Sequence, residues 1–259
     1  MVVAAGRLIY PGRFVVAKQH DADESMGRPA MTNKIWYLKR CDLFERLAPE
    51  QAERLESRSV MRRFTKGDII YLPSDLAQSV LVLASGRVKI KGLTPDGKEF
   101  IYAFIEPGEI FGELALVDES SRDEFAEALE ASEVLAIARN DLFALMAAQP
   151  EVSLGITKLL GFRRKRIEMR LRNIMFRSNR QRVLGVLLEL LDTYGERLGS
   201  NWQIRLQLSH QELASLIGAT RETVTIVLGQ LQLEGFIRVK RRSITILDRE
   251  RLVAESAAE

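Results

Sequence analysis

Residues 209–234 read SHQELASLIGATRETVTIVLGQLQLE, which is the pattern of two short helices joined by a tight turn. Ser209 and Glu212 form a capping box that starts the first helix. Gly218 can adopt the left-handed conformation that ends a helix at low cost, and Thr220 can cap the second helix. Apolar residues recur at helical spacing in both halves, as Leu213, Leu216 and Ile217, then Val224, Val227, Leu228 and Leu231. The stretch therefore predicts a packed pair of helices.

The remaining residues of this stretch favour a DNA-binding helix-turn-helix over an ordinary helical hairpin, which is the alternative. Ala214, Gly218 and Val224 have the spacing of such a motif. Polar side chains gather at the exposed start of the second helix, the part that can enter a major groove, and they are Arg221, Glu222, Thr223 and Thr225. The pattern predicts a recognition helix near residues 221–234.

Composition narrows the class of protein. The chain has 259 residues, enough for two domains with cores of their own. A single cysteine, Cys41, excludes a disulfide framework or a cysteine-ligated cluster within one chain. The two histidines, His20 and His210, are far apart in sequence and suggest no metal site. No apolar run approaches the ~20 residues of a membrane span, so we expect a cytoplasmic protein that does not engage a membrane.

Charge is distributed unevenly along the chain. Residues 139–259 contain 20 Lys and Arg against 13 Asp and Glu, whereas residues 1–138 contain 18 against 22. A basic C-terminal half fits nucleic acid bound at that end only. Together with the helix-turn-helix pattern, this charge predicts double-stranded DNA as a partner.

Residues 1–33 show no sustained periodicity. The apolar segment from Val2 to Ala5 is too short for a signal peptide. A regular segment begins at Met31, and Met26 lies just before it. We therefore expect either a disordered arm or a translation start assigned too early.

Residues 34–149 predict a small β domain. A helix is expected from Pro49, and from Val60 short aliphatic runs alternate with turn glycines. This pattern favours an antiparallel β-sandwich or jelly roll within an α+β protein. The predicted strands are 60–64, 68–72, 80–84, 87–91, 100–105 and 133–138.

Residues 150–177 predict one long helix that starts at Pro150. Its apolar residues form a single stripe made of Val152, Ile156, Leu159, Leu160, Ile167, Leu171 and Ile174. A stripe of this length must be covered, and a second copy of the chain is the simplest cover. We therefore expect a homodimer through this helix, with packing on the chain's own sandwich as the alternative.

Residues 178–259 are expected to form a winged helix-turn-helix domain. Ser178 or Asn179 marks a break after the long helix. Two strands near 236–239 and 244–247 enclose a basic sequence made of Lys240, Arg241 and Arg242. A hairpin with a basic tip is a wing that can contact phosphates.

Over about residues 35–250 the chain resembles the CRP/FNR family of transcriptional regulators. The motifs that carry the resemblance are Lys66-Gly67-Asp68, Gly86-Arg87-Val88, the run PGEIFGELAL over residues 107–116, the run LSHQELA over residues 208–214 and Arg221-Glu222-Thr223-Val224. The resemblance implies a cyclic-nucleotide-binding-like sandwich, a dimerisation helix and a winged helix-turn-helix. It also implies a homodimer that reads a palindromic operator and acts with RNA polymerase.

The resemblance indicates a candidate effector site. In cyclic-AMP-binding members a Gly-Glu-Leu turn and an Arg-Ser pair hold the cyclic phosphate. The matching residues here are Gly112, Glu113, Leu114, Ala115, Arg122 and, from the long helix, Arg163. Asp123 replaces the serine and would repel a phosphate. Ile167 and Glu168 replace the hydroxyl residues that contact adenine in those members. Three alternatives therefore stay open for the effector: cyclic AMP, another small molecule, or no ligand at all.

Other cofactors of the family do not fit these residues. Iron–sulfur members need four cysteines, and haem members need axial ligands that Cys41 and His20 are poorly placed to supply. We expect no metal, haem or iron–sulfur cofactor.

At the DNA the resemblance implies base reading by Arg221 and Glu222, because arginine suits guanine O6 and N7 and glutamate suits cytosine N4. Ile226 stands where many members have another arginine, and it can touch a thymine methyl. The positions that hold the DNA backbone match Ser209, His210 and Gln211.

Two other classes of function remain as alternatives. A cyclic-nucleotide sensor whose output is not transcription is one, although the helix-turn-helix and the basic wing argue against it. An enzyme is the other, and it is disfavoured because the sequence contains no paired carboxylates, Ser/His/Asp set or phosphate-binding loop with lysine.

Overall fold

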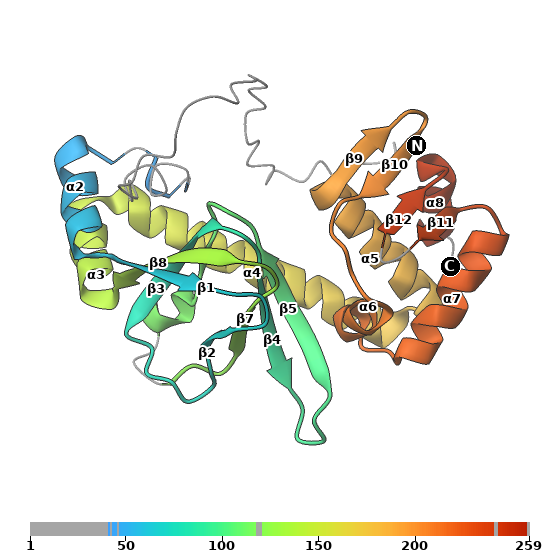
Figure 1. Ribbon diagram of the computed structural model, residues 1–259, viewed down its shortest axis with the longest axis horizontal. Helices are drawn as coiled ribbons and strands as arrows, with labels where there is room; N and C mark the ends of the chain where they lie inside the picture. Colours follow the sequence, from blue (N-terminus) through green and yellow to red (C-terminus); the bar gives the residue numbers. More distant parts are fainter. Residues whose placement is uncertain (1–40, 42, 46, 118–120, 241–242, 258–259) are drawn as a thin grey trace, which may run out of the picture.

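The computed structural model describes residues 41–257 apart from 42, 46, 118–120 and 241–242. A β-sandwich lies at one end, a winged helix-turn-helix domain lies at the other, and the long helix α4 (Pro150–Phe176) runs between them (Figure 1). This arrangement confirms the expected α+β fold class. The expectations for residues 1–33, and for Arg241 and Arg242, concern residues outside those described.

The sandwich consists of two antiparallel four-stranded sheets, ordered β1-β8-β3-β6 and β2-β7-β4-β5. Strands distant in sequence are therefore neighbours, as in a jelly roll. The strands are β1 (Val60–Phe64), β2 (Ile69–Tyr71), β3 (Ser79–Ser85), β4 (Val88–Leu93), β5 (Glu99–Ile105), β6 (Ile110–Phe111), β7 (Phe125–Ala128) and β8 (Ser132–Ala138). The predicted strands are all present with small differences at their ends, and β6 and β7 are additional.

Strand β3 contributes to two cores because successive side chains point to opposite faces of a sheet. Leu81 and Leu83 are buried between the two sheets. Val80 and Val82 are buried on the opposite face, under α2 (Pro49–Arg58), α3 (Arg139–Ala148) and the first turns of α4. A strand covered on both faces reads as a continuous apolar run, which is how it appears in the sequence.

Helix α4 is a shared element with two different environments. The expectation that its whole apolar stripe lies at a subunit seam is wrong for the first turns, because Val152 and Ile156 are only 2% and 3% exposed in the core between the helices and the outer face of their own sandwich. The later residues of the stripe, Ile167, Leu171 and Ile174, remain exposed. The helix begins on the sandwich and then extends beyond it, so the chain itself covers only the first part of the stripe.

The C-terminal domain is a winged helix-turn-helix, as expected. Its elements are α5 (Asn179–Tyr194), β9 (Gly195–Leu198), β10 (Asn201–Ile204), α6 (His210–Ile217), α7 (Arg221–Leu233), β11 (Ile237–Lys240), β12 (Ser243–Ile246) and α8 (Arg249–Ala257). The strands form one sheet in the order β11-β12-β10-β9. Ser178 caps α5, since its hydroxyl accepts from the Gln181 N–H at 3.3 Å. Leu206 and Leu208 follow β10 and are buried in the core.

The two domains meet at strand β5. Ile101 and Phe104 of β5 belong to the same buried cluster as the C-terminal core, and β5 packs against α6. The Arg170 guanidinium of α4 donates to the backbone oxygens of Ile101 and Tyr102, at 3.1 and 2.6 Å, and to Glu189 of α5 at 3.2 Å. One side chain therefore joins the sandwich, the long helix and the DNA-binding domain.

Within the described ranges, no helix is long and apolar enough to cross a membrane. The same residues include no group of three or more His, Cys, Asp or Glu side chains placed to hold a metal ion.

Candidate nucleic-acid interface and effector site

The caps seen in the sequence fix the two helices of the motif. The Ser209 N–H donates to the Glu212 carboxylate at 2.7 Å, and the Glu212 N–H donates to the Ser209 hydroxyl at 3.2 Å. Gly218 ends α6 with φ of 65°, in the left-handed region that favours glycine. The Thr220 hydroxyl accepts from the Thr223 N–H at 3.2 Å and starts α7. Local hydrogen bonds therefore set the turn that positions α7.

Helix α7 buries its apolar face and presents its polar start to solvent. Val224 is 0% exposed, whereas Ile226 is 61% exposed on the opposite side. Arg221 and Glu222 are both exposed in the first turn. The pKa of the Glu222 carboxyl is lowered because its own backbone N–H and the Thr220 hydroxyl donate to the carboxylate. The residue at this position is thus an ionised acceptor at neutral pH.

One contact between the two helices has no signal in the sequence. The Thr225 hydroxyl donates to the Arg221 carbonyl at 2.9 Å, and His210 Nδ1 lies 2.8 Å from the same hydroxyl. Because the hydroxyl proton is used towards Arg221, the Thr225 oxygen accepts from Nδ1–H. The contact holds the His210 ring at the N-terminus of α6, beside the exposed start of α7.

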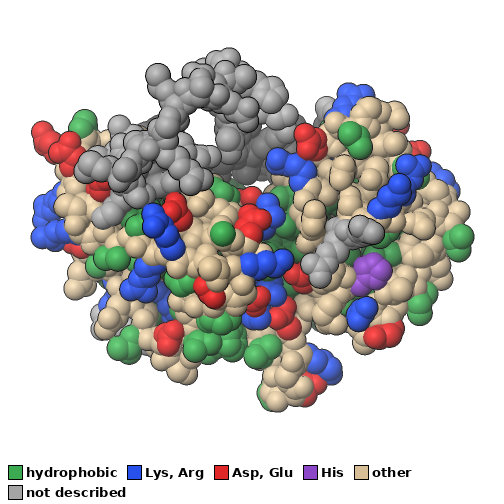
Figure 2. Space-filling view, viewed as in Figure 1, with side chains coloured by type: hydrophobic (Ala, Val, Ile, Leu, Met, Phe, Trp, Pro, Cys, Tyr) green, Lys and Arg blue, Asp and Glu red, His purple; other side chains and the backbone are tan. Residues whose placement is uncertain are grey.

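The wing is tied to α7. The Val239 N–H of β11 donates to the Gln232 side-chain oxygen of α7 at 2.8 Å. Lys240 is exposed and pairs with Ser243 across the hairpin. Figure 2 shows Lys and Arg side chains on the face of this domain that also carries the histidine. Basic groups therefore lie on the same face as the start of the motif.

The matched effector turn is held by the long helix. Gly112 has φ of 65° and leads into the short helix η1 (Glu113–Leu116). Glu113 is only 3% exposed, and its carboxylate pairs with the Arg163 guanidinium. Arg163 also donates to the Ile110 carbonyl. Arg163 therefore belongs to this turn and not to the solvated face of α4.

Arg122 is buried in the same place and has partners within the chain. Its guanidinium donates to the Gly112 carbonyl at 3.3 Å and to the Ser79 carbonyl at 2.6 Å. It also lies 4.1 Å from the centre of the Tyr71 ring. A Cβ at Gly112 would approach Arg122 Nη1 to 2.5 Å, so glycine makes room for the arginine as well as for the turn.

Tyr71 and Glu124 complete this cluster, although neither was predicted from the sequence. The Tyr71 hydroxyl donates to the Glu124 carboxylate at 2.7 Å. Burial raises the pKa of both the Tyr71 hydroxyl and the Glu124 carboxyl. The sequence indicates only that Tyr71, an aromatic residue in a predicted strand, is buried. Nothing in the sequence links Tyr71 to Glu124.

The other predicted effector residues have less part in the cluster. Ala115 is 1% exposed and packs in the core under the helices, whereas Leu114 is 47% exposed. Asp123 is exposed, directly after the buried Arg122. The structure therefore brings together Gly112, Glu113, Arg122 and Arg163, and leaves Asp123 facing solvent.

Two family models match the chain. The Cyclic nucleotide-binding domain matches residues 61–149, and the Crp-like helix-turn-helix domain matches residues 181–255. These ranges contain the turn at Gly112 and helix α7 described above.

Relatives match about three quarters or more of this chain. The chain is 36% identical over 221 residues to a Cyclic AMP receptor protein of Thermus thermophilus, covering 85% of this chain and 98% of that protein. It is 30% identical to a Global nitrogen regulator of Nostoc sp., covering 72% of this chain and 85% of that protein. FixK2 from Bradyrhizobium japonicum has a similar structure, with a TM-score of 0.68 and 25% identity over 78% of this chain and 98% of that one. The chain thus belongs to the CRP/FNR family of DNA-binding transcriptional regulators.

Proposed function

We propose that the protein is a homodimer that reads a two-fold symmetric operator with the start of α7 from each subunit. The observation that carries this proposal is the exposed polar first turn of α7, fixed by the Thr220 cap over the buried Val224. Two such helices would enter successive major grooves ~34 Å apart. In this proposal residues 34–149 are the effector-like domain, 150–177 the dimerisation helix and 178–259 the DNA-binding domain.

Base reading is assigned to the exposed face of α7. Arg221 would donate to guanine O6 and N7, and the ionised Glu222 would accept from cytosine N4. Ile226 is exposed and apolar, which suits a thymine methyl. The supporting contacts to the groove edge and to phosphates are assigned to Thr220, Thr223, Thr225, Ser209, His210, Gln211, Lys240, Arg241 and Arg242.

The dimer is assigned to the exposed part of α4. Leu171 and Met175 are 56% and 64% exposed although they are apolar and lie on one helix. A second copy related by a two-fold axis would cover both, because each position then meets itself.

The polar side chains of the effector-like cluster are already engaged by other groups of the same chain. Arg122, the group that would bind a cyclic phosphate, already donates to two carbonyls and stacks on Tyr71. Glu113, which would bind a ribose hydroxyl, is paired with Arg163. A ligand has to displace these contacts, and Asp123 adds a like charge to any phosphate. We therefore assign to this protein at most a weak response to cyclic AMP.

Family membership supports two further assignments. RNA polymerase is the proposed protein partner at the promoter, and the cytoplasm is the proposed location.

A gel-shift titration on promoter fragments, followed by footprinting, tests this function. We expect protection of two half-sites whose centres are about one helical turn apart, with two chains bound per fragment. Equal affinity for every fragment and for random DNA would contradict a sequence-specific regulator and would favour a sensor without DNA output.

A further inference from the structure

The Thr225 hydroxyl joins the two helices of the motif and has no proton left for a second acceptor. It donates to the Arg221 carbonyl at 2.9 Å, and His210 Nδ1 lies 2.8 Å from the same oxygen. A neutral imidazole carries one N–H proton, on Nδ1 or on Nε2. Because the Thr225 oxygen acts as an acceptor towards the ring, the proton of a neutral His210 lies on Nδ1.

The place of this proton decides what the other ring nitrogen can do. Nε2 is turned away from Thr225 across the ring, and no residue that the structure describes hydrogen-bonds to it. In the Nδ1–H form Nε2 carries a lone pair and is an acceptor. A phosphate oxygen is also an acceptor, so the neutral ring cannot donate to the DNA backbone. The imidazolium has a proton on each nitrogen, so it can keep the Thr225 contact and donate to a phosphate.

The place of the ring suits a phosphate. His210 is the first residue of α6, directly after the Ser209 cap. Backbone N–H groups without helical partners make a helix N-terminus attractive to anions. In the proposed complex this end of α6 lies against the DNA backbone while the start of α7 enters the major groove. A donor on the ring would therefore meet a phosphate oxygen.

The other charged groups of α6 and α7 are Glu212, Arg221 and Glu222. The Glu212 carboxylate accepts from the Ser209 hydroxyl at 2.7 Å, so it is engaged in the cap. The pKa of the Glu222 carboxyl is lowered chiefly because its own backbone N–H donates to it, so its charge is constant between pH 6 and pH 8. Within the described residues, none of these carboxylates forms an ion pair with His210.

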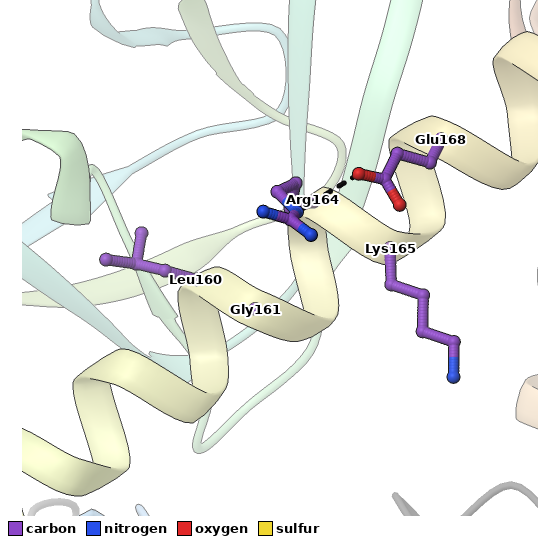
Figure 3. A pocket seen from close by; sticks show the side chains of 5 residues that line it. All are labelled: Leu160, Gly161, Arg164, Lys165 and Glu168. Atoms are coloured by element: carbon purple, nitrogen blue, oxygen red, sulfur yellow. Dashed lines mark ion pairs between the residues drawn. The ribbon is translucent and has the colours of Figure 1, made fainter.

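The other elements packed against α6 are α5 and β5, and their charged groups have partners of their own. Burial raises the pKa of the Tyr102 and Tyr194 hydroxyls, which therefore stay neutral in this pH range. On α4, Arg164 and Glu168 pair with each other at 3.1 Å beside a surface hollow (Figure 3). The contacts of the charged groups on α5 and β5 are Arg180 with Glu234 and Glu255, Glu189 with Arg166 and Arg170, Asp192 with Arg249, Glu99 with Lys89 and Lys91, and Arg182 with the Arg177 and Ile174 carbonyls.

We propose that Thr225 is a positioning residue that fixes the proton of neutral His210 on Nδ1, so that His210 holds a DNA phosphate only as an imidazolium and each chain takes up one proton from solvent on binding DNA. This inference rests on the proposed function and adds a control of DNA binding by pH. Histidine is the residue type that ordinarily changes charge between about pH 5 and 8. Because the complex holds more protons than the free protein, DNA affinity strengthens as pH falls and weakens as pH rises.

The test measures DNA affinity of the full-length protein against pH. Fluorescence anisotropy at fixed salt, with labelled operator and with random DNA of equal length, covers pH 6 to pH 8. Affinity should rise by up to about tenfold per pH unit for each proton taken up, and equally on both DNAs, because a phosphate contact carries no sequence information. His210→Ala should flatten this profile. A steep profile retained by His210→Ala would overturn the inference.

Variants of Thr225 separate positioning of the ring from a merely structural contact. Thr225→Val has a similar shape but no hydroxyl, so the neutral ring can carry its proton on Nε2 and donate to a phosphate. It should flatten the pH profile and still bind more tightly at pH 8 than His210→Ala. Thr225→Ser keeps the hydroxyl, is the matched control and should keep the steep profile. A steep profile for Thr225→Val, or affinity at pH 8 equal to that of His210→Ala, would contradict the inference. Circular dichroism checks that each variant is folded.

Nitrogen NMR of the imidazole tests the position of the proton without DNA. In a His20→Gln background His210 is the single histidine of the chain. At pH 8 its proton should lie on Nδ1, and Thr225→Val should move it to Nε2, the nitrogen that free histidine prefers. A proton on Nε2 beside the unaltered Thr225 would overturn the inference whether or not the protein binds DNA.

The outcomes separate this inference from the proposed function. An unaltered protein that binds no DNA, or binds every sequence equally, would contradict the proposed function. Sequence-specific binding whose affinity does not change with pH would contradict only the role assigned to His210 and Thr225.

Discussion

Among single residues, Arg221 provides the most direct test of base reading. Arg221→Ala is expected to weaken binding to the best operator by about 1–3 kcal/mol and to relax the preference for one guanine. Competition titrations with operators altered at each position measure both effects. Lys240→Ala is the comparison variant, because loss of a phosphate contact should weaken all sequences alike and reduce the salt slope by about 1. An equal loss from Arg221→Ala on operator and random DNA would refute the assignment.

Glu124 provides a test of the buried cluster through pH. Burial raises the pKa of this carboxyl in the folded protein, so folding favours its neutral form. Its contribution to stability is therefore complete below the unfolded pKa, ~4.3, and is lost as pH rises through the folded pKa. Glu124→Gln, whose amide oxygen can still accept from Tyr71, should raise the melting temperature at pH 7 and have no such benefit at pH 4. Glu53→Gln on the exposed face of α2 is the control, and an equal gain there would refute the explanation.

A contact between two site residues could be predicted only where the two residues are close together in the sequence. Ser209 and Glu212 could be paired from the sequence because a capping box is a local pattern. The contact from Tyr71 to Glu124 joins residues 53 positions apart, and no local rule relates them. Arg163 could be assigned to the effector site from the resemblance to the family. Its ion pair with Glu113 could not be predicted, because the two residues are far apart in sequence and only the fold brings them together.

At the scale of elements, periodicity made most helices and strands predictable. Strand β7 has the sequence Phe-Ala-Glu-Ala, whose alanines have little strand preference, and β6 has two residues, so neither could be recognised. Helix α8 is mostly polar and was also missed, although its Leu252 is fully buried. The ends of α4 were predicted well, but the stripe in the sequence does not show that its first residues are buried against the sandwich and its later ones are exposed.

The division of α4 leads to opposite outcomes for two similar substitutions. Ile156→Glu should unfold the sandwich, because a carboxylate would be buried without a partner in a core position that is 3% exposed. Ile156→Ala should cost about 2–5 kcal/mol of unfolding free energy. Leu171 lies on the exposed part of α4, so Leu171→Glu should leave the melting of the monomer nearly unchanged while weakening the proposed dimer.

Denaturant unfolding and sedimentation at several protein concentrations distinguish these outcomes. A folded, monomeric Ile156→Glu variant would show that the first turns of α4 do belong to the subunit seam. An unfolded Leu171→Glu variant would show that the later turns pack on their own chain.

At the scale of the whole molecule, the response to a ligand depends on how the sandwich is coupled to DNA binding. Because Arg122 and Glu113 are engaged by the chain itself, we expect cyclic AMP to change operator affinity by less than about tenfold, which is ~1.4 kcal/mol of coupling. Fluorescence anisotropy with a labelled operator, with and without the nucleotide, measures this change. Asp123→Ser should improve nucleotide binding if the cluster can open. A micromolar dissociation constant for cyclic AMP with strongly enhanced operator binding would contradict this expectation.

Arg163 and Arg164 are consecutive on α4 but have different surroundings, because Arg163 contacts the sandwich whereas Arg164 is exposed. Neighbouring residues of a helix are separated by about 100° around its axis. Arg163 is fixed by Glu113 and Ile110 of the sandwich, so the sandwich sets the angle at which Arg164 points outward. If the proposed dimer forms there, a ligand that loosened Arg163 would turn the seam out of phase with its copy, and a well-matched seam would hold the effector turn closed. The effector turn and the dimer contact would then be coupled by the rotation of α4 about its own axis.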